Sequence, residues 1–245
     1  MTPLASLRSL RSFRPGIAYV LDALYLAPTA RSPAARTMRS CRGSRFARKD
    51  SGLAPLPASR AAQQTASGTG FEPLPDGARE PTAAELDRLV REWVAATGSA
   101  RVVFQGDGDP LAAADVVVET LRLAEGSGAA FRVNTLGIAR GADVDALLAS
   151  AALVDTVSVF LPAADAATYD ALLRPRAAGG FEDACAFVRR AAASGMRVEV
   201  TAVDRPDVAV ADVEALAGRL GATDFRTRSW LGSPQRLGSP QRGPV

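Results

Sequence analysis

From residue 101 onward, short runs rich in β-branched and aromatic residues alternate with longer stretches whose apolar residues recur at helical spacing. The strand-like runs are 101–105, 131–135, 156–161, 197–203 and 224–227. The helix-like stretches are 112–125, 144–151, 166–173, 181–194 and 210–220. This alternation with short connections predicts parallel βαβ units joined by right-handed crossovers, and therefore an α/β fold.

Two further elements precede this alternating part. Residues 82–97 have helical spacing, and Thr82 with Glu85 forms the sequence pattern of a capping box at the start of that helix. Residues 17–26 predict one more strand in the same sheet, which gives about six strands. Residues 40–76 are rich in Arg, Ser, Ala, Gly and Pro without a hydrophobic period, so we expect an irregular insert there.

The two ends of the chain have biased compositions. Residues 1–16 are rich in Arg, Ser and Leu and contain no acidic residue, which is typical of an organelle transit segment or of a disordered basic leader. Residues 231–236 are repeated letter for letter as 237–242, so 231–245 is predicted to be a low-complexity tail. One domain, residues 17–230, remains between them.

Composition excludes several classes of function. The 245 residues contain 47% hydrophobic residues, enough for one core, and no apolar run has the roughly 18 to 20 residues of a membrane span, which predicts a soluble protein. The chain has 2 cysteines and no histidine, which excludes histidine-based zinc sites and Ser-His-Asp triads. The net charge of +3 is concentrated near the N-terminus without interleaved aromatic residues, so nucleic-acid binding is not favoured.

The loop Gln105-Gly106-Asp107-Gly108-Asp109-Pro110 places glycines and carboxylates directly after the predicted strand 101–105. In α/β folds the loops at the carboxyl ends of parallel strands converge and hold ligands. A tight turn without a ligand is the alternative interpretation of such a loop.

An ordered series of short motifs extends from about residue 19 to residue 230. The motifs are Asp22-Ala23-Leu24-Tyr25-Leu26, Arg79-Glu80-Pro81-Thr82, Gly106-Asp107-Gly108-Asp109-Pro110, Val133-Asn134-Thr135-Leu136-Gly137, Val154-Asp155-Thr156-Val157-Ser158-Val159, Thr168-Tyr169, Arg174-Pro175 and Val203-Asp204-Arg205-Pro206. With this series the chain resembles the radical S-adenosylmethionine (SAM) superfamily, in particular its TatD-associated branch.

This resemblance implies a partial (βα)6 TIM-like barrel, with SAM or a related nucleoside bound across the carboxyl ends of the strands. Gly106 and Gly108 would allow close backbone approach, and Asp109-Pro110 would replace the Glu-Pro that meets the amino group of SAM in the family. Other residues would lie on the same rim. They are Asn134, Thr135, Gly137 and Ser158.

The chain departs from the family where the [4Fe-4S] cluster should be bound. The family holds the cluster by Cys-x3-Cys-x2-Cys, whereas an ungapped alignment from Tyr25 places Ser32, Arg36 and Arg39 at these positions. A side chain without a thiolate cannot replace such a ligand, and the remaining cysteines are Cys41 and Cys185. A further departure is Phe160-Leu161-Pro162 in place of the family's Ser-Leu-Asn.

We therefore expect a degenerate member, a pseudoenzyme that keeps a SAM-binding rim and lacks the metal site. One alternative is an active enzyme whose cluster uses Cys41 and thiols of a partner chain. The other is a non-catalytic interaction module. The sequence indicates neither a substrate nor an oligomeric state, and it predicts a location in the cytoplasm or, with a transit segment, in an organelle.

Overall fold

A single sheet forms the centre of the protein in the computed structural model, which describes residues 14, 16–20, 22–42 and 77–231. The 7 strands follow one another in chain order and the sheet does not close on itself. They are β1 (Ala18–Val20), β2 (Leu24–Leu26), β3 (Arg101–Phe104), β4 (Ala130–Thr135), β5 (Thr156–Phe160), β6 (Val198–Asp204) and β7 (Asp224–Ser229). All neighbours from β2 to β7 are parallel, which confirms the predicted α/β fold of a partial barrel.

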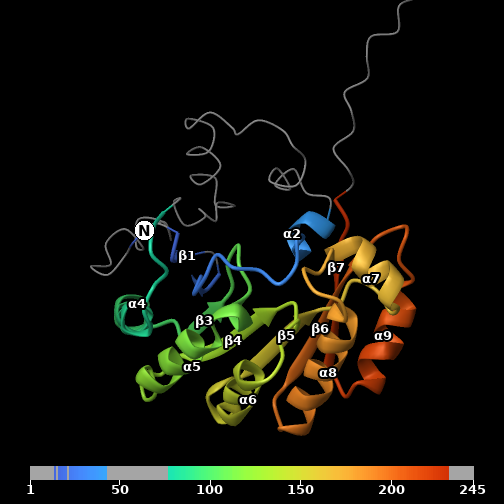
Figure 1. Ribbon diagram of the computed structural model, residues 1–245. Helices are drawn as coiled ribbons and strands as arrows, with labels where there is room; N and C mark the ends of the chain where they lie inside the picture. The colour runs from blue at the N-terminus through green and yellow to red at the C-terminus, as the bar shows by residue number, and fades with distance from the viewer. Residues whose placement is uncertain (1–13, 15, 21, 43–76, 232–245) are drawn as a thin grey trace, which may run out of the picture.

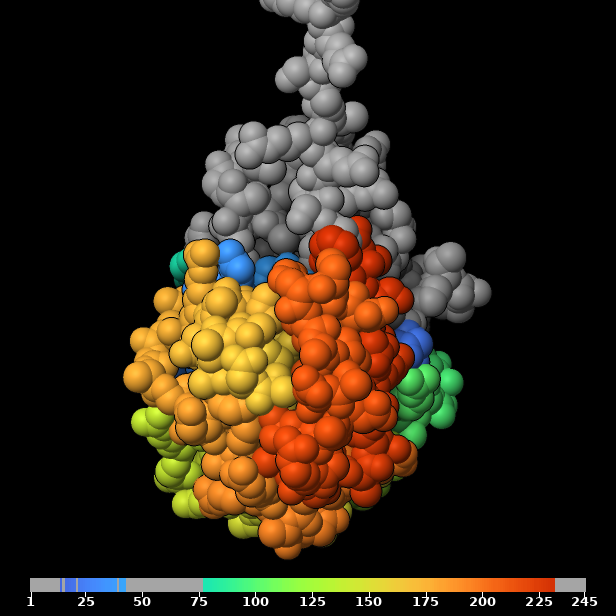
Figure 2. Space-filling model, turned by 90° about the vertical axis from the view of Figure 1, so that its right-hand side faces the viewer, coloured from blue at the N-terminus to red at the C-terminus, as the bar shows by residue number. Residues whose placement is uncertain are grey.

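The long helices cover the outer face of this sheet (Figure 1). The helices are α2 (Met38–Cys41), α4 (Ala83–Thr97), α5 (Ala114–Leu123), α6 (Ala142–Ala149), α7 (Ala166–Leu173), α8 (Gly180–Ala193) and α9 (Val210–Arg219), with 3-10 turns η2 (Pro110–Ala113) and η3 (Ala151–Leu153). Figure 2 shows the side where α7, α8 and α9 form a continuous surface. Among the described residues, no helix is both long and apolar enough to cross a bilayer.

Side chains of each strand alternate between the helices and the opposite, inner face. In β4, Phe131 and Val133 are buried in the core with the helices, whereas Arg132 and Asn134 are only partly buried and line a pocket on the inner face. The sheet therefore presents polar side chains on the face that the helices do not cover.

The N-terminal strand prediction needs a correction. Residues 17–26 form two antiparallel strands, with Ala18 opposite Leu26, instead of one strand. Asp22 lies between them, and its carboxylate accepts hydrogen bonds from the Tyr25 hydroxyl (2.8 Å) and from Arg101 (2.9 Å). These contacts fix a turn at Asp22, so that β2 alone joins the parallel part of the sheet beside β3.

The remaining elements agree with the predictions to within a few residues. The largest difference is at 112–125, where η2 precedes α5, because Asp109 caps the chain and Pro110 begins the 3-10 turn. Most of the predicted leader 1–16, the insert 40–76 and the tail 231–245 lies outside the described residues.

The capping box of α4 predicts a pH-dependent contribution to stability. Glu85 accepts from the Thr82 backbone and from both terminal nitrogens of Arg79, which lower the pKa of Glu85 from 4.5 to about 2. Because the pKa of Glu85 is lower in the folded than in the unfolded protein, its ionised carboxylate stabilises the folded protein above pH 4.5. This stabilisation is lost as the pH falls from 4.5 towards 2. Glu85→Gln should therefore be less stable than the wild type at pH 7 and equal to it near pH 2.

This prediction is measured by urea unfolding across that pH range. Thr82→Ala is the matched variant, since it removes the neutral cap and should cost about 1 kcal/mol with less dependence on pH. A stability difference between the wild type and Glu85→Gln that stays constant with pH would contradict the role of the charge.

Candidate functional site

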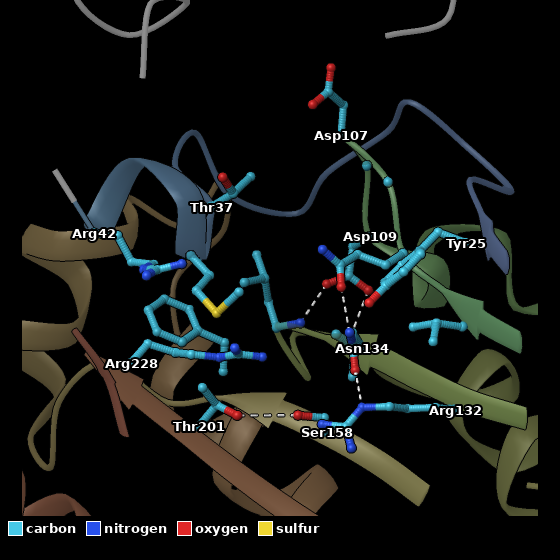
Figure 3. Close-up of a pocket in the computed structure, with 18 of the residues that line it drawn as sticks. Tyr25, Thr37, Arg42, Asp107, Asp109, Arg132, Asn134, Ser158, Thr201 and Arg228 are labelled. Carbon is cyan, nitrogen blue, oxygen red and sulfur yellow. Dashed lines mark hydrogen bonds between the residues drawn. The ribbon is translucent and has the colours of Figure 1, made fainter. Parts of the chain in front are cut away.

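A pocket of about 570 Å³ lies on the inner face, at the carboxyl ends of the strands. This volume falls within the range of roughly 300–1,000 Å³ that is common for small-molecule sites. Strands β1 to β7 and helix α2 all contribute to its wall (Figure 3). The charged residues among the lining side chains are Asp22, Arg42, Arg101, Asp107, Asp109, Arg132, Arg226 and Arg228.

Hydrogen bonds connect the polar side chains on the floor of this pocket. Arg132 donates from Nε to Asn134 Oδ1 at 2.7 Å and forms an ion pair with Glu199. The Asn134 amide in turn donates to Gln105 at the end of β3. The end of β3, strand β4 and strand β6 are thereby joined across the sheet, so that the Asn134 side chain is held in one orientation.

Glu199 is the acceptor at the centre of this network. The hydroxyls of Ser158 and Thr201 lie 3.0 Å and 3.2 Å from its carboxylate. Burial raises the pKa of Glu199, but the Arg132 guanidinium together with both hydroxyls outweighs burial and lowers it. Because the Ser158 hydrogen points to Glu199, its oxygen can offer a ligand an acceptor.

Asp109 connects the loop after β3 with the end of β4. The residue is 3% exposed, and its carboxylate accepts from Leu111 N (2.9 Å), the Thr135 hydroxyl (2.7 Å) and Leu136 N (2.6 Å). Burial raises the pKa of Asp109, whereas these three donors act in the opposite direction. The protein's own donors thus use three of the acceptor positions of this carboxylate.

Gly108 approaches the backbone of the segment that leads from β2 to α2. A Cβ atom on Gly108 would lie 2.4 Å from the Thr29 carbonyl oxygen and 2.5 Å from that of Arg31. The next residue, Asp109, donates its backbone N–H to the Arg31 carbonyl at 2.8 Å. The glycine therefore allows the loop after β3 to pack closely against the backbone of residues 29–31.

The structure brings together most of the site residues expected from the sequence. The members that line the pocket are Gly106, Gly108, Asp109, Asn134, Thr135 and Ser158. Pro110 and Gly137 lie outside the lining. Pro110 is buried in η2, and Gly137 has a positive φ of 72° and packs near Val159, where a Cβ would lie 3.1 Å from Cγ1.

Several lining residues were missed by the sequence interpretation. Arg226 and Arg228 are two residues apart in β7, and residues at this spacing lie on the same face of a strand. The spacing is the sequence signal that could have identified them. On the other side of the pocket, Tyr19 and Tyr25 stack with ring centroids 4.6 Å apart. Burial and the Asp22 carboxylate raise the pKa of Tyr25 to about 12, so its hydroxyl stays protonated.

The segment aligned with the family's cluster loop is used for internal contacts. Ala34 forms a bridge with Pro175, and the Arg36 N–H donates to Leu173 O at 3.0 Å. Ser32 lines the pocket, and Arg39 lies in α2. This loop therefore packs against the end of α7 and the residues that follow it.

Neither cysteine is placed to hold a cluster in this pocket. Cys41 is buried and donates to Leu172 O at 3.5 Å, and Cys185 is buried in α8, where burial raises the pKa of its thiol. In the part of the chain that the structure describes, no group of three or more His, Cys, Asp or Glu side chains could hold a metal ion. The described residues that line this pocket include no cysteine, and a [4Fe-4S] cluster needs thiolate ligands, so these residues do not fit the cluster.

Comparison with known proteins identifies the family. The profile of the Radical SAM superfamily matches residues 61–220. No curated protein matches the chain. Streptococcus suis SuiB bound to its precursor peptide SuiA has a similar structure, with a TM-score of 0.53 and 15% identity over 62% of this chain and 34% of SuiB.

Two other structures have the same fold. SuiB bound to S-adenosylmethionine has a TM-score of 0.53 and 14% identity over 64% of this chain and 36% of SuiB. TYW1 with a lysine-pyruvate adduct has a TM-score of 0.53 and 12% identity over 92% of this chain and 73% of TYW1. The chain spans about a third of the length of SuiB.

Proposed function

Because the chain belongs to the radical SAM superfamily, we propose that it binds SAM or a related nucleoside in the inner-face pocket and does not cleave it reductively. The observation that carries this proposal is a ligand-sized pocket at the strand ends whose lining contains no cysteine. The pocket supports binding, and the missing thiolates argue against the family's radical chemistry.

Side chains around the pocket offer the groups that SAM requires. An ionised carboxylate can accept about four hydrogen bonds, so Asp109, which uses three, keeps capacity for the ammonium group of SAM. The stacked Tyr19 and Tyr25 provide an aromatic wall, and Asn134 and Ser158 provide polar contacts. The structure of SuiB with SAM supports this choice of ligand for the fold.

The ordered motifs further support a place in the TatD-associated branch, as a pseudoenzyme within it. The loop that would hold the cluster carries Ser32 and Arg36 and is tied to residues 173–176. We assign no catalytic residue. We propose the cytoplasm, or an organelle reached by the basic leader, as the location.

Thermal melting with and without SAM, on protein whose iron content is measured after anaerobic reconstitution, tests the proposal. A native-state ligand at 100 times its dissociation constant stabilises by about 2.7 kcal/mol. We expect such a shift in the wild type and in Thr227→Val, whose side chain lies outside the pocket lining. In Asn134→Leu we expect SAM to bind roughly tenfold more weakly, through the loss of one hydrogen bond.

Iron is expected well below the roughly four atoms per chain of a full cluster. A stoichiometric cluster would contradict the proposal and favour an active enzyme with Cys41 and partner thiols as ligands. Absence of any melting shift with SAM would favour the interaction module instead.

A further inference from the structure

Three arginines gather on one side of the pocket. Arg42 ends helix α2, and Arg226 and Arg228 lie on β7. The register of the sheet pairs Arg226 with Thr201, which also lines the pocket, and Arg228 is two residues further along the same face. Figure 3 shows Arg42 and Arg228 across the pocket from Tyr25, Asp109 and Asn134. The arginines therefore form a separate end of the cavity.

These arginines differ from the other two arginines of the pocket in their partners. Arg101 is paired with Asp22 at 2.9 Å, and Arg132 is paired with Glu199. Within residues 14, 16–20, 22–42 and 77–231, no carboxylate lies within ion-pair distance of Arg42, Arg226 or Arg228. Among the described residues, the positive charge at this end of the pocket is therefore not held in an ion pair, and the Glu199 carboxylate, which is paired with Arg132, acts on Arg228 only from a longer distance.

Arg228 carries the clearest sign of a missing partner. Its Nε atom is buried and forms no hydrogen bond to the described residues. Burial lowers the pKa of Arg228, and the neighbouring Arg226 and Arg42 guanidiniums lower it further. Arginine nevertheless remains protonated, so three like charges are held together at a cost. An anion bound between them would reduce this repulsion and satisfy the buried donor.

We propose that Arg42, Arg226 and Arg228 bind the phosphate group of a phosphorylated small-molecule ligand. A phosphate monoester carries about −1.5 to −2 charges and three acceptor oxygens, which suits three guanidiniums better than the single charge of a carboxylate. This inference names the chemical class of a second ligand for the pocket of the proposed function. It rests on the proposed function only because it takes that pocket as a ligand site. Phosphate and SAM would then occupy opposite ends of the cavity.

Titration with inorganic phosphate alone tests the subsite. Melting temperature and binding heat are measured at constant ionic strength, with acetate as the carboxylate probe. We expect a saturable phosphate shift in the wild type, and dissociation constants roughly 10- to 100-fold weaker in Arg226→Gln and Arg228→Gln, since hydrogen bonds to charged groups are lost. Arg226 is exposed on the edge strand, so its replacement should not impair folding.

Arg101→Gln is the matched control. It removes an arginine from the same pocket, but one whose charge is already neutralised by Asp22. Its phosphate affinity should stay within about twofold of the wild type, since the exposed pair is screened. An unsaturable rise in melting temperature, equal in all variants, would be a general salt effect and would overturn the proposal. Acetate binding as tightly as phosphate would overturn the assignment to phosphate.

The relation to SAM separates this inference from the proposed function. Protein saturated with phosphate should keep its affinity for SAM. Strict competition would mean that the arginines bind the carboxylate of SAM, which would overturn the assignment of a second, phosphorylated ligand. If SAM fails to bind while phosphate binds saturably and Arg228→Gln weakens phosphate binding as expected, the subsite stands and the proposed function fails.

Discussion

Replacement of Asp109 by Ala is expected to lower the free energy of unfolding by about 3 to 5 kcal/mol. The carboxylate accepts from Leu111 N, Leu136 N and the Thr135 hydroxyl, and the residue is 3% exposed. An alanine would leave three donors buried without an acceptor, and each such donor costs about 1–3 kcal/mol. Urea unfolding at pH 7 measures the loss.

Asp107 provides the control for this experiment. It lies at the tip of the same loop (Figure 3) and is only partly buried, so Asp107→Ala should cost less stability than Asp109→Ala, whose residue is 3% exposed. If Asp109→Ala keeps the wild-type stability but loses the melting shift with SAM, the carboxylate serves the ligand and not the loop.

The glutamate that the family places at this position gives a second comparison. Asp109→Glu adds one methylene in a buried site, and overpacking of this kind costs about 1–3 kcal/mol. A stable Asp109→Glu protein with stronger SAM binding would show that the shorter side chain weakens a ligand contact.

Local patterns were sufficient to predict the elements that carry the site. Hydrophobic alternation gave β4 and β5, and because the carboxyl ends of parallel strands converge, Asn134 and Ser158 could be placed on one rim. The turn at Asp22 was missed because Arg101, 79 positions away in the sequence, contributes to holding it. The sequence of residues 17–26 alone does not indicate the hydrogen bond between Asp22 and Arg101.

The arginine cluster could not be predicted for a similar reason. Arg228 falls just beyond the predicted strand 224–227, and Arg42 falls in the region predicted to be irregular. Their meeting depends on α2 lying beside β7, where Arg42 Nε donates to Ser229 O, 187 positions away, at 3.2 Å and Leu231 N donates to Arg42 O at 2.8 Å. Contacts between residues so far apart in the sequence form only in the folded protein and leave no local sequence pattern.

Gly108→Ala is expected to destabilise the protein by about 1–3 kcal/mol, the usual cost of overpacking. The added Cβ would lie 2.4 Å from Thr29 O and 2.5 Å from Arg31 O. Both atoms belong to the backbone, so the loop after β3 must move away from the segment that follows β2. That movement also weakens the hydrogen bond from Asp109 N to Arg31 O.

Gly218→Ala is the matched control, because nothing lies within 4 Å of its added Cβ and the residue is in α9. Alanine there should stabilise the helix by up to about 1 kcal/mol. Urea unfolding and the melting shift with SAM are measured for both variants. Unchanged stability of Gly108→Ala with loss of the SAM shift would mean that the glycine makes room for a ligand, whereas lowered stability with a retained SAM shift would mean that it makes room for the chain's own backbone.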